Sequence, residues 1–113
     1  TGNFDLETKG YEYLAPLFLL EFNLKNKYLQ DKRVRQAIAH AVNRDLVVKT
    51  VWFGFGKPAT GPVPSVLTQF YSANVPAYAF DVKKADQLLD DAGFKRGADG
   101  KRFKLVHDFL PYG

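Results

Sequence analysis

Residues 31–44 read DKRVRQAIAHAVNR and carry the most regular pattern in this sequence. Apolar residues recur there at the spacing of one helical face: Val34, Ala37, Ile38, Ala41 and Val42. Asp31 precedes them as an N-cap, because its carboxylate can accept a free backbone N–H of the first turn. The stretch predicts an amphipathic helix. Because its alanine side chains are small, this helix could lie close against a sheet.

Two more helices are predicted after this one. Asn43 interrupts the first pattern and is expected to cap a second helix, whose apolar run ends near Gly54. Asp81 is the N-cap of a third helix, and Gly93 is placed to end it in the left-handed conformation. The third apolar face consists of Ala85, Leu88, Leu89 and Ala92.

Two segments outside the helices have the pattern of strands. Residues 17–22 alternate after Pro16, and residues 103–110 read FKLVHDFL. Residues 55–80 form a long, proline-rich connection, and long ordered loops are commonly functional. The order predicts an α/β (α+β) fold, a small mixed sheet packed with about three helices. Two strands make a poor sheet, so we expect this chain to be part of a longer polypeptide.

Composition excludes several classes of protein. The 113 residues are 46% hydrophobic and 25% charged, which is typical of globular proteins and not of disordered ones. The longest apolar stretch is too short to cross a membrane. A cysteine zinc site and a disulfide scaffold are impossible without cysteine, and the lack of methionine also indicates a segment of a longer chain.

The net charge of +4 is spread evenly along the sequence. Residues 1–56 and residues 57–113 each carry eight basic and six acidic side chains. This favours a solvated surface, because nucleic-acid-binding proteins usually cluster their basic residues. A small basic nucleic-acid-binding domain, with bases stacked on aromatic side chains, remains the alternative from another class.

Catalytic chemistry is not indicated. His40 and His107 lack a metal-ligand spacing, and no serine lies in a G-x-S-x-G setting. We therefore predict no enzyme, no metal site and no cofactor. Aromatic residues concentrate near residues 17–22 and 52–80, where they either wall a ligand pocket or pack the core.

Four stretches together resemble a known family, the extracellular solute-binding proteins of family 5. They are DKRVRQAIAHAVNR at 31–44, GFG at 54–56, GPVP at 61–64 and FDVKKADQLLDDAGF at 80–94. The family comprises the peptide- and nickel-binding receptors of bacterial ABC importers. The resemblance runs from about Tyr11 to Tyr112 with its spacing intact.

The resemblance implies a two-lobed receptor that closes on its ligand about a hinge. The chain would be part of the second lobe, a periplasmic-binding-protein type II lobe. Residues 1–23 would be the lead-in and the lobe-crossing strand, and residues 24–113 the α/β portion. The lobe crossing would use Leu20, Glu21, Phe22 and Asn23. The expected ligand-binding residues are Phe18, Leu19, Pro62 and Val63.

The implied partners follow from the family. The parent would capture an oligopeptide or similar small solute and deliver it to the ABC permease membrane subunits. It would be periplasmic, or extracellular and membrane-anchored in a Gram-positive source, and would bind no nucleic acid. Peptide-binding relatives often carry tyrosines where this chain has Phe18, Leu19 and Leu20, which leaves open a bulky or less polar ligand. A strand-swapped interaction module, dimeric through exposed sheet edges, is a further alternative.

Overall fold

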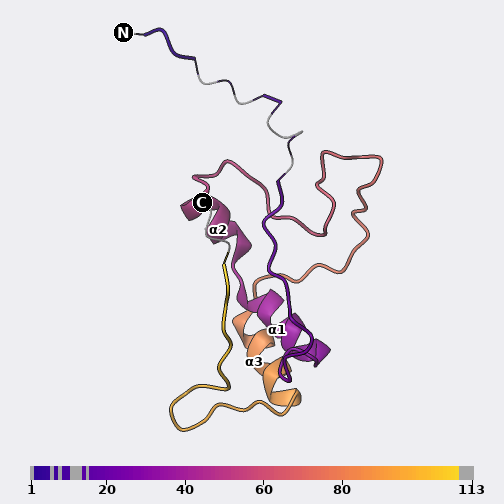
Figure 1. Ribbon diagram of the computed structural model, residues 1–113, viewed down its shortest axis with the longest axis vertical. Coiled ribbons are helices and arrows are strands. Elements are labelled where there is room, and N and C mark those ends of the chain that lie inside the picture. Colours follow the sequence, from indigo (N-terminus) through magenta and orange to yellow (C-terminus); the bar gives the residue numbers. More distant parts are fainter. Residues whose placement is uncertain (1, 6, 8, 11–13, 15, 110–113) are drawn as a thin grey trace. The chain divides into compact units, whose positions relative to one another are not determined.

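A computed structural model of the chain describes residues 2–5, 7, 9–10, 14 and 16–109. Its helices are α1 (Lys32–Ala41), α2 (Arg44–Val51) and α3 (Val82–Asp91) (Figure 1). All three predicted helices are confirmed, and the connection between α2 and α3 is irregular, as expected. None of the helices in the described ranges is long and apolar enough to cross a membrane.

The predicted strands are not formed in the described part of the chain. Residues 17–22 and 103–109 have no ladder partner there, and residue 110 lies outside the described residues. A strand exists only through hydrogen bonds to a neighbouring strand, so two isolated extended segments cannot make a sheet. The small mixed sheet is therefore not found in this part of the chain, and the predicted dimer through exposed sheet edges has no support.

The chain divides into two compact units. The α2 unit consists of Thr1–Glu21 and Asn43–Tyr78, and the helix-pair unit, which contains α1 and α3, consists of Phe22–Val42 and Ala79–Gly113. The backbone passes from one unit to the other three times: between residues 21 and 22, 42 and 43, and 78 and 79.

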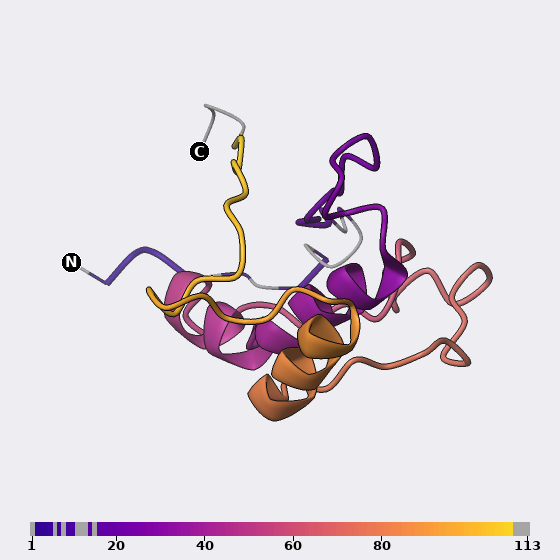
Figure 2. The same ribbon diagram turned by 90° about the horizontal axis from the view of Figure 1, so that it is seen from below.

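The core of the helix-pair unit lies where α1 packs against α3, which Figure 2 shows side by side. Val34 and Ala37 of α1 are fully buried, Ala85 of α3 is 4% exposed, and Leu29 is 8% exposed. Small side chains at this contact let the two backbones approach closely. The predicted face of α1 is buried only in part, because Ala41 and Val42 at its end are exposed.

Local hydrogen bonds set the helix ends. The carboxylates of Asp31 and Asp81 accept the backbone N–H groups of Arg33 (2.8 Å) and Lys84 (2.9 Å). The side-chain oxygen of Asn43 accepts the N–H of Leu46 at 3.0 Å, so all three predicted caps are confirmed.

Gly93 ends α3 as predicted, with φ of 89°. The N–H of Phe94 donates to the Leu89 carbonyl (2.9 Å) and that of Gly93 to the Asp90 carbonyl (3.0 Å). These two bonds form a Schellman motif, which satisfies carbonyls that the helix leaves without partners.

The segment after α3 packs back on the helix-pair unit through aromatic rings. Tyr28 stacks on Phe103 with ring centroids 4.7 Å apart, and Phe94 meets both rings edge-on at 5.5 and 5.3 Å. Residues 97–100 form a turn, since the N–H of Gly100 donates to the Gly97 carbonyl at 2.9 Å. Phe103, expected in a strand, instead contributes to this cluster.

An arginine beside the cluster holds the C-terminal segment to α3. Arg102 is 9% exposed, and its guanidinium donates to the carboxylates of Asp86 (3.0 Å) and Asp90 and to the Phe94 carbonyl (2.6 Å). The bond from Arg102, supported by Arg96, lowers the pKa of the Asp86 carboxyl below its usual value.

The α2 unit has a different character, because α2 buries none of its residues. Leu46, Val47 and Val51 are 52%, 43% and 60% exposed. The helix ends where Phe53 and Gly54 adopt positive φ, and the Gly54 N–H donates to the Val48 carbonyl at 3.0 Å. This helix therefore leaves most of its apolar surface uncovered within the described chain.

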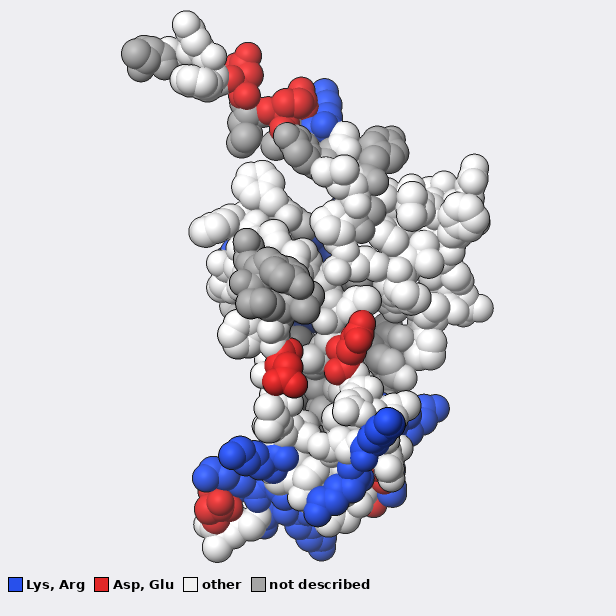
Figure 3. Space-filling view, viewed as in Figure 1, with Lys and Arg blue, Asp and Glu red and all other residues white. Residues whose placement is uncertain are grey.

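Charge is distributed unequally between the units, although it is even along the sequence. The helix-pair unit carries twelve basic and seven acidic side chains, a net charge of +5, and the α2 unit carries four and five, a net charge of −1. Figure 3 shows Lys and Arg gathered where Figure 1 places α1 and α3. The even spread along the sequence therefore does not carry over to the folded units.

Candidate functional site

The four expected ligand-binding residues all belong to the α2 unit. Phe18 and Leu19 are 73% and 60% exposed, Pro62 is exposed and Val63 is half-buried. In the described part of the chain, no ring contact or hydrogen bond joins Phe18 or Leu19 to the two loop residues. Their role in ligand binding stays a prediction.

Trp52 is a site candidate that sequence reasoning did not single out. Its ring lies against the Phe18 ring, with centroids 4.6 Å apart and planes tilted by 46°. Trp52 follows α2 directly, so this contact sets the extended segment at 17–22 beside the start of the long loop. The lone tryptophan in an aromatic-rich stretch was the signal available in the sequence.

The expected lobe crossing coincides with a boundary between the units. The backbone leaves the α2 unit after Glu21 and enters the helix-pair unit at Phe22. Leu20 and Glu21 are exposed and Phe22 is half-buried. Asn23 begins a turn, since its side-chain oxygen accepts the N–H of Lys25 at 3.0 Å. Bending of this stretch on ligand binding stays a prediction.

The long loop after α2 is held by an arginine at the start of that helix. Arg44 donates from Nη1 to the Ala59 carbonyl at 3.0 Å and from Nη2 to the Tyr78 carbonyl at 2.7 Å. Inside the loop, the Thr60 and Tyr71 hydroxyl groups lie 3.2 Å apart. Nothing in the sequence indicated these partners of Arg44, which lie 15 and 34 residues away.

His40 makes two contacts at the end of α1. Its Nδ1 lies 2.7 Å from the Ala79 carbonyl, and its own backbone carbonyl accepts the N–H of Asp81 at 2.8 Å. Both contacts join the end of α1 to the start of α3 within the helix-pair unit.

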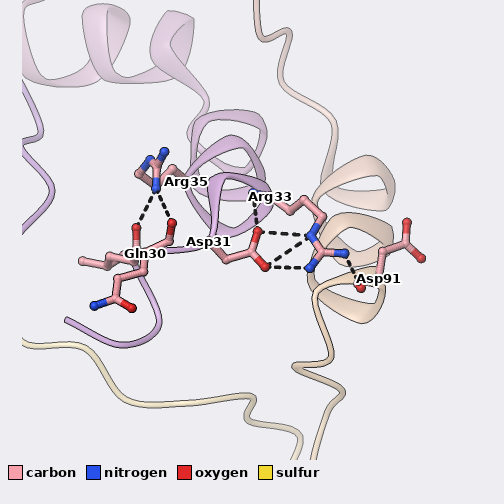
Figure 4. A network of polar contacts seen from close by, with 6 residues as sticks. Gln30, Asp31, Arg33, Arg35 and Asp91 are labelled. Carbon is pink, nitrogen blue, oxygen red and sulfur yellow. Dashed lines mark hydrogen bonds and ion pairs between the residues drawn. The ribbon is translucent and has the colours of Figure 1, made fainter. Parts of the chain in front are cut away.

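Arg33 and Arg35, flanking the buried Val34, are also structural (Figure 4). Arg33 pairs with the Asp31 carboxylate at 2.7 Å and donates to the Asp91 carbonyl at 2.7 Å. The hydrogen bonds from Arg33 lower the pKa of the Asp31 carboxyl. Arg35 donates to the carbonyls of Leu29 (2.8 Å) and Gln30 (2.9 Å). Both arginines therefore hold the start of α1 to neighbouring backbone carbonyls.

The described residues show no group of three or more His, Asp or Glu side chains that could hold a metal ion. What they offer is exposed apolar surface on the extended segment at 17–22, an aromatic pair and a long loop closed at its base.

Comparison with known proteins shows one consistent similarity. The profile of the family described as "Bacterial extracellular solute-binding proteins, family 5 Middle" matches residues 9–112. The dipeptide-binding protein of Escherichia coli K12 is 38% identical over 78 residues, covering 69% of this chain and 14% of that protein. The glutathione-binding protein of Pectobacterium atrosepticum is 33% identical over 78 residues, covering 69% of this chain and 15% of that protein.

Solved structures show the same similarity. NikZ from Campylobacter jejuni in complex with Ni(L-His) has 38% identity and a TM-score of 0.65, covering 74% of this chain and 16% of that one. The periplasmic binding protein DppA from Helicobacter pylori in complex with the peptide STSA has 37% identity and a TM-score of 0.61, covering 66% and 14%. The chain therefore spans about a seventh of the length of the proteins it matches.

Proposed function

Because this chain belongs to the bacterial extracellular solute-binding proteins of family 5, we propose that it forms part of one lobe of an ABC importer receptor. The observation that carries the proposal is the family match, which extends over residues 9–112. The uncovered α2 and the two extended segments without ladder partners support it, since a part of a larger lobe would leave such surfaces for the remainder.

The remainder of the receptor would complete the sheet. In this proposal, residues 17–22 and 103–110 join strands from elsewhere in a type II lobe, which supplies hydrogen-bond partners for them. Residues 1–23 are the lead-in and lobe-crossing strand, and residues 24–113 belong to the second lobe. The exposed backbone between Leu20 and Asn23 then acts as part of the hinge.

The ligand is an oligopeptide or a similar small solute. Relatives are named for a dipeptide and glutathione, and related structures hold Ni(L-His) and the peptide STSA. Phe18, Leu19, Pro62 and Val63 would form an apolar part of the pocket wall, with Trp52 behind Phe18. Apolar walls with few polar groups are typical of small-molecule sites.

The receptor is not an enzyme and needs no cofactor for this role. It would close on its solute in the periplasm, or outside the cell while anchored to the membrane, and then dock on the permease subunits. Binding and release by lobe closure require a difference in affinity between the open and closed forms, not chemical change in the solute.

A thermal-shift experiment on the full-length receptor tests the proposal. Alanyl-alanine, glutathione and nickel–histidine are each added, and at least one should raise the melting temperature in a saturable way, because a ligand stabilises the state that it binds. Histidine without nickel and a single-stranded oligonucleotide serve as controls. Stabilisation by the oligonucleotide alone would contradict the receptor role and favour the nucleic-acid-binding alternative.

A further inference from the structure

The guanidinium of Arg44 joins two backbone positions that are far apart in the loop. Its two terminal nitrogens donate to the carbonyls of Ala59 and Tyr78 at 3.0 and 2.7 Å. Because those nitrogens belong to one rigid, planar group, the two carbonyls must lie close together. Residues 60–77 thus form a loop whose base is closed by one side chain.

The positive charge of Arg44 is committed to these carbonyls. No acidic side chain of the described chain lies within ion-pair distance of it, in contrast to Arg33, Arg96 and Arg102. The group is half-buried. Charge-assisted hydrogen bonds from a partly buried guanidinium are among the stronger polar contacts in proteins.

The rest of the loop depends mainly on short-range contacts of its own. Turns bring the N–H groups of Phe70 and Tyr71 to the Leu67 carbonyl, each at 2.9 Å, and the Thr60 and Tyr71 hydroxyl groups meet at 3.2 Å. These bonds shape the loop internally. The two hydrogen bonds of Arg44 connect this loop to the start of α2.

We propose that Arg44 is a positioning residue, which holds the loop at 60–77 against α2 and thereby sets the location of Pro62 and Val63. As far as the ligand is concerned, this inference rests on the proposed receptor function. The two terminal nitrogens of the planar Arg44 guanidinium are essential to this role. A lysine retains the charge but presents a single nitrogen, which cannot hold both carbonyls in the same way.

Amide hydrogen exchange on the 113-residue chain tests the positioning role. Arg44→Lys should speed exchange at the hydrogen-bonded amides of Leu67, Phe70 and Tyr71 by about tenfold, as expected when a charge-assisted contact at the base is lost. Exchange at Ala85 and Ala92 in the helix-pair unit should stay unchanged, which shows that the chain is still folded. Arg96→Lys, the same chemical change in the helix-pair unit, is the matched control and should leave the loop amides unaffected.

A binding measurement on the full-length receptor separates the two proposals. With alanyl-alanine, glutathione or nickel–histidine, whichever the unsubstituted receptor binds, Arg44→Lys should weaken affinity about tenfold through faster dissociation, at an unchanged melting temperature. Unchanged affinity would overturn the positioning role at the ligand while leaving the receptor function intact. If none of the three probes binds the unsubstituted receptor, the receptor function is contradicted, and the exchange experiment still decides whether Arg44 holds the loop. Equal loop exchange in Arg44→Lys and the original chain would overturn the inference altogether.

Discussion

At the scale of single residues, a few charged side chains join parts of the helix-pair unit that are distant in sequence. Asp81 caps α3 with its carboxylate and uses its backbone N–H to contact the His40 carbonyl at the end of α1. Arg33, in the first turn of α1, donates to the Asp91 carbonyl at the end of α3, where the helix dipole favours a cation. Each residue thus serves both a local and a tertiary contact.

Acid stability should depend on Asp86. Its folded-state pKa is lowered by the bond from Arg102, so its carboxylate contributes stability above the unfolded value of about 3.9, and this is lost as the pH falls through the lowered folded value. Urea unfolding of the chain, followed by circular dichroism from pH 7 down to pH 2, should therefore show declining stability in the acid range.

Asp86→Asn is the matched variant for this measurement, because it keeps the shape and removes the titrating group. Its stability should be lower at pH 7 and should decline less in acid. Asp31, whose pKa is also lowered, accounts for the decline that remains. Identical pH dependence in the variant and the original chain would show that the Arg102 contact does not contribute.

At the scale of elements, the helices are defined by their ends and by small contact residues. Val34, Ala37 and Ala85 form the contact between α1 and α3, and the Schellman motif turns the chain after α3 so that Phe94 reaches Tyr28. The aromatic cluster therefore depends on where α3 stops.

Gly93→Ala should destabilise the helix-pair unit. A Cβ at this position meets nothing within 4 Å, so the cost comes from the backbone, whose φ of 89° is unfavourable for an L-residue by about 1–2 kcal/mol. Gly61→Ala is the control, since a Cβ there also has open space and its backbone has no positive φ. Urea unfolding midpoints measure both variants. Equal midpoints would contradict a left-handed helix end at Gly93.

At the scale of the whole molecule, the folded units separate charges that the sequence intermixes. The net charges of +5 and −1 arise because residues 22–42 and 79–113, which hold most of the basic side chains, come together in one unit. A positive unit attracts polyanions weakly and without sequence preference at low salt.

Oligonucleotide binding should accordingly be weak and sensitive to salt. Fluorescence anisotropy with a labelled single strand should detect weak association with the chain at about 50 mM salt, and this should disappear by about 200 mM, as counterion release predicts for non-specific contacts. A dissociation constant well below about 1 μM at physiological salt would instead support the nucleic-acid-binding alternative.

The sequence by itself determined the three helices, their caps at Asp31, Asn43 and Asp81, the stop at Gly93 and the family. These follow from the sequence because a cap or an apolar face depends on residues within a few positions of one another. Only the tertiary structure decided the partners of Arg44, the packing of Phe103 on Tyr28 and the grouping of charge.

The two predicted strands are not formed in the described residues, for the same physical reason. Alternation in residues 17–22 and 103–109 describes a side-chain pattern, whereas a strand also requires a neighbouring backbone to accept and donate its hydrogen bonds. The described chain provides no such neighbour. Contacts within one helical turn can be derived from sequence, but contacts across the chain exist only once the fold brings their partners together.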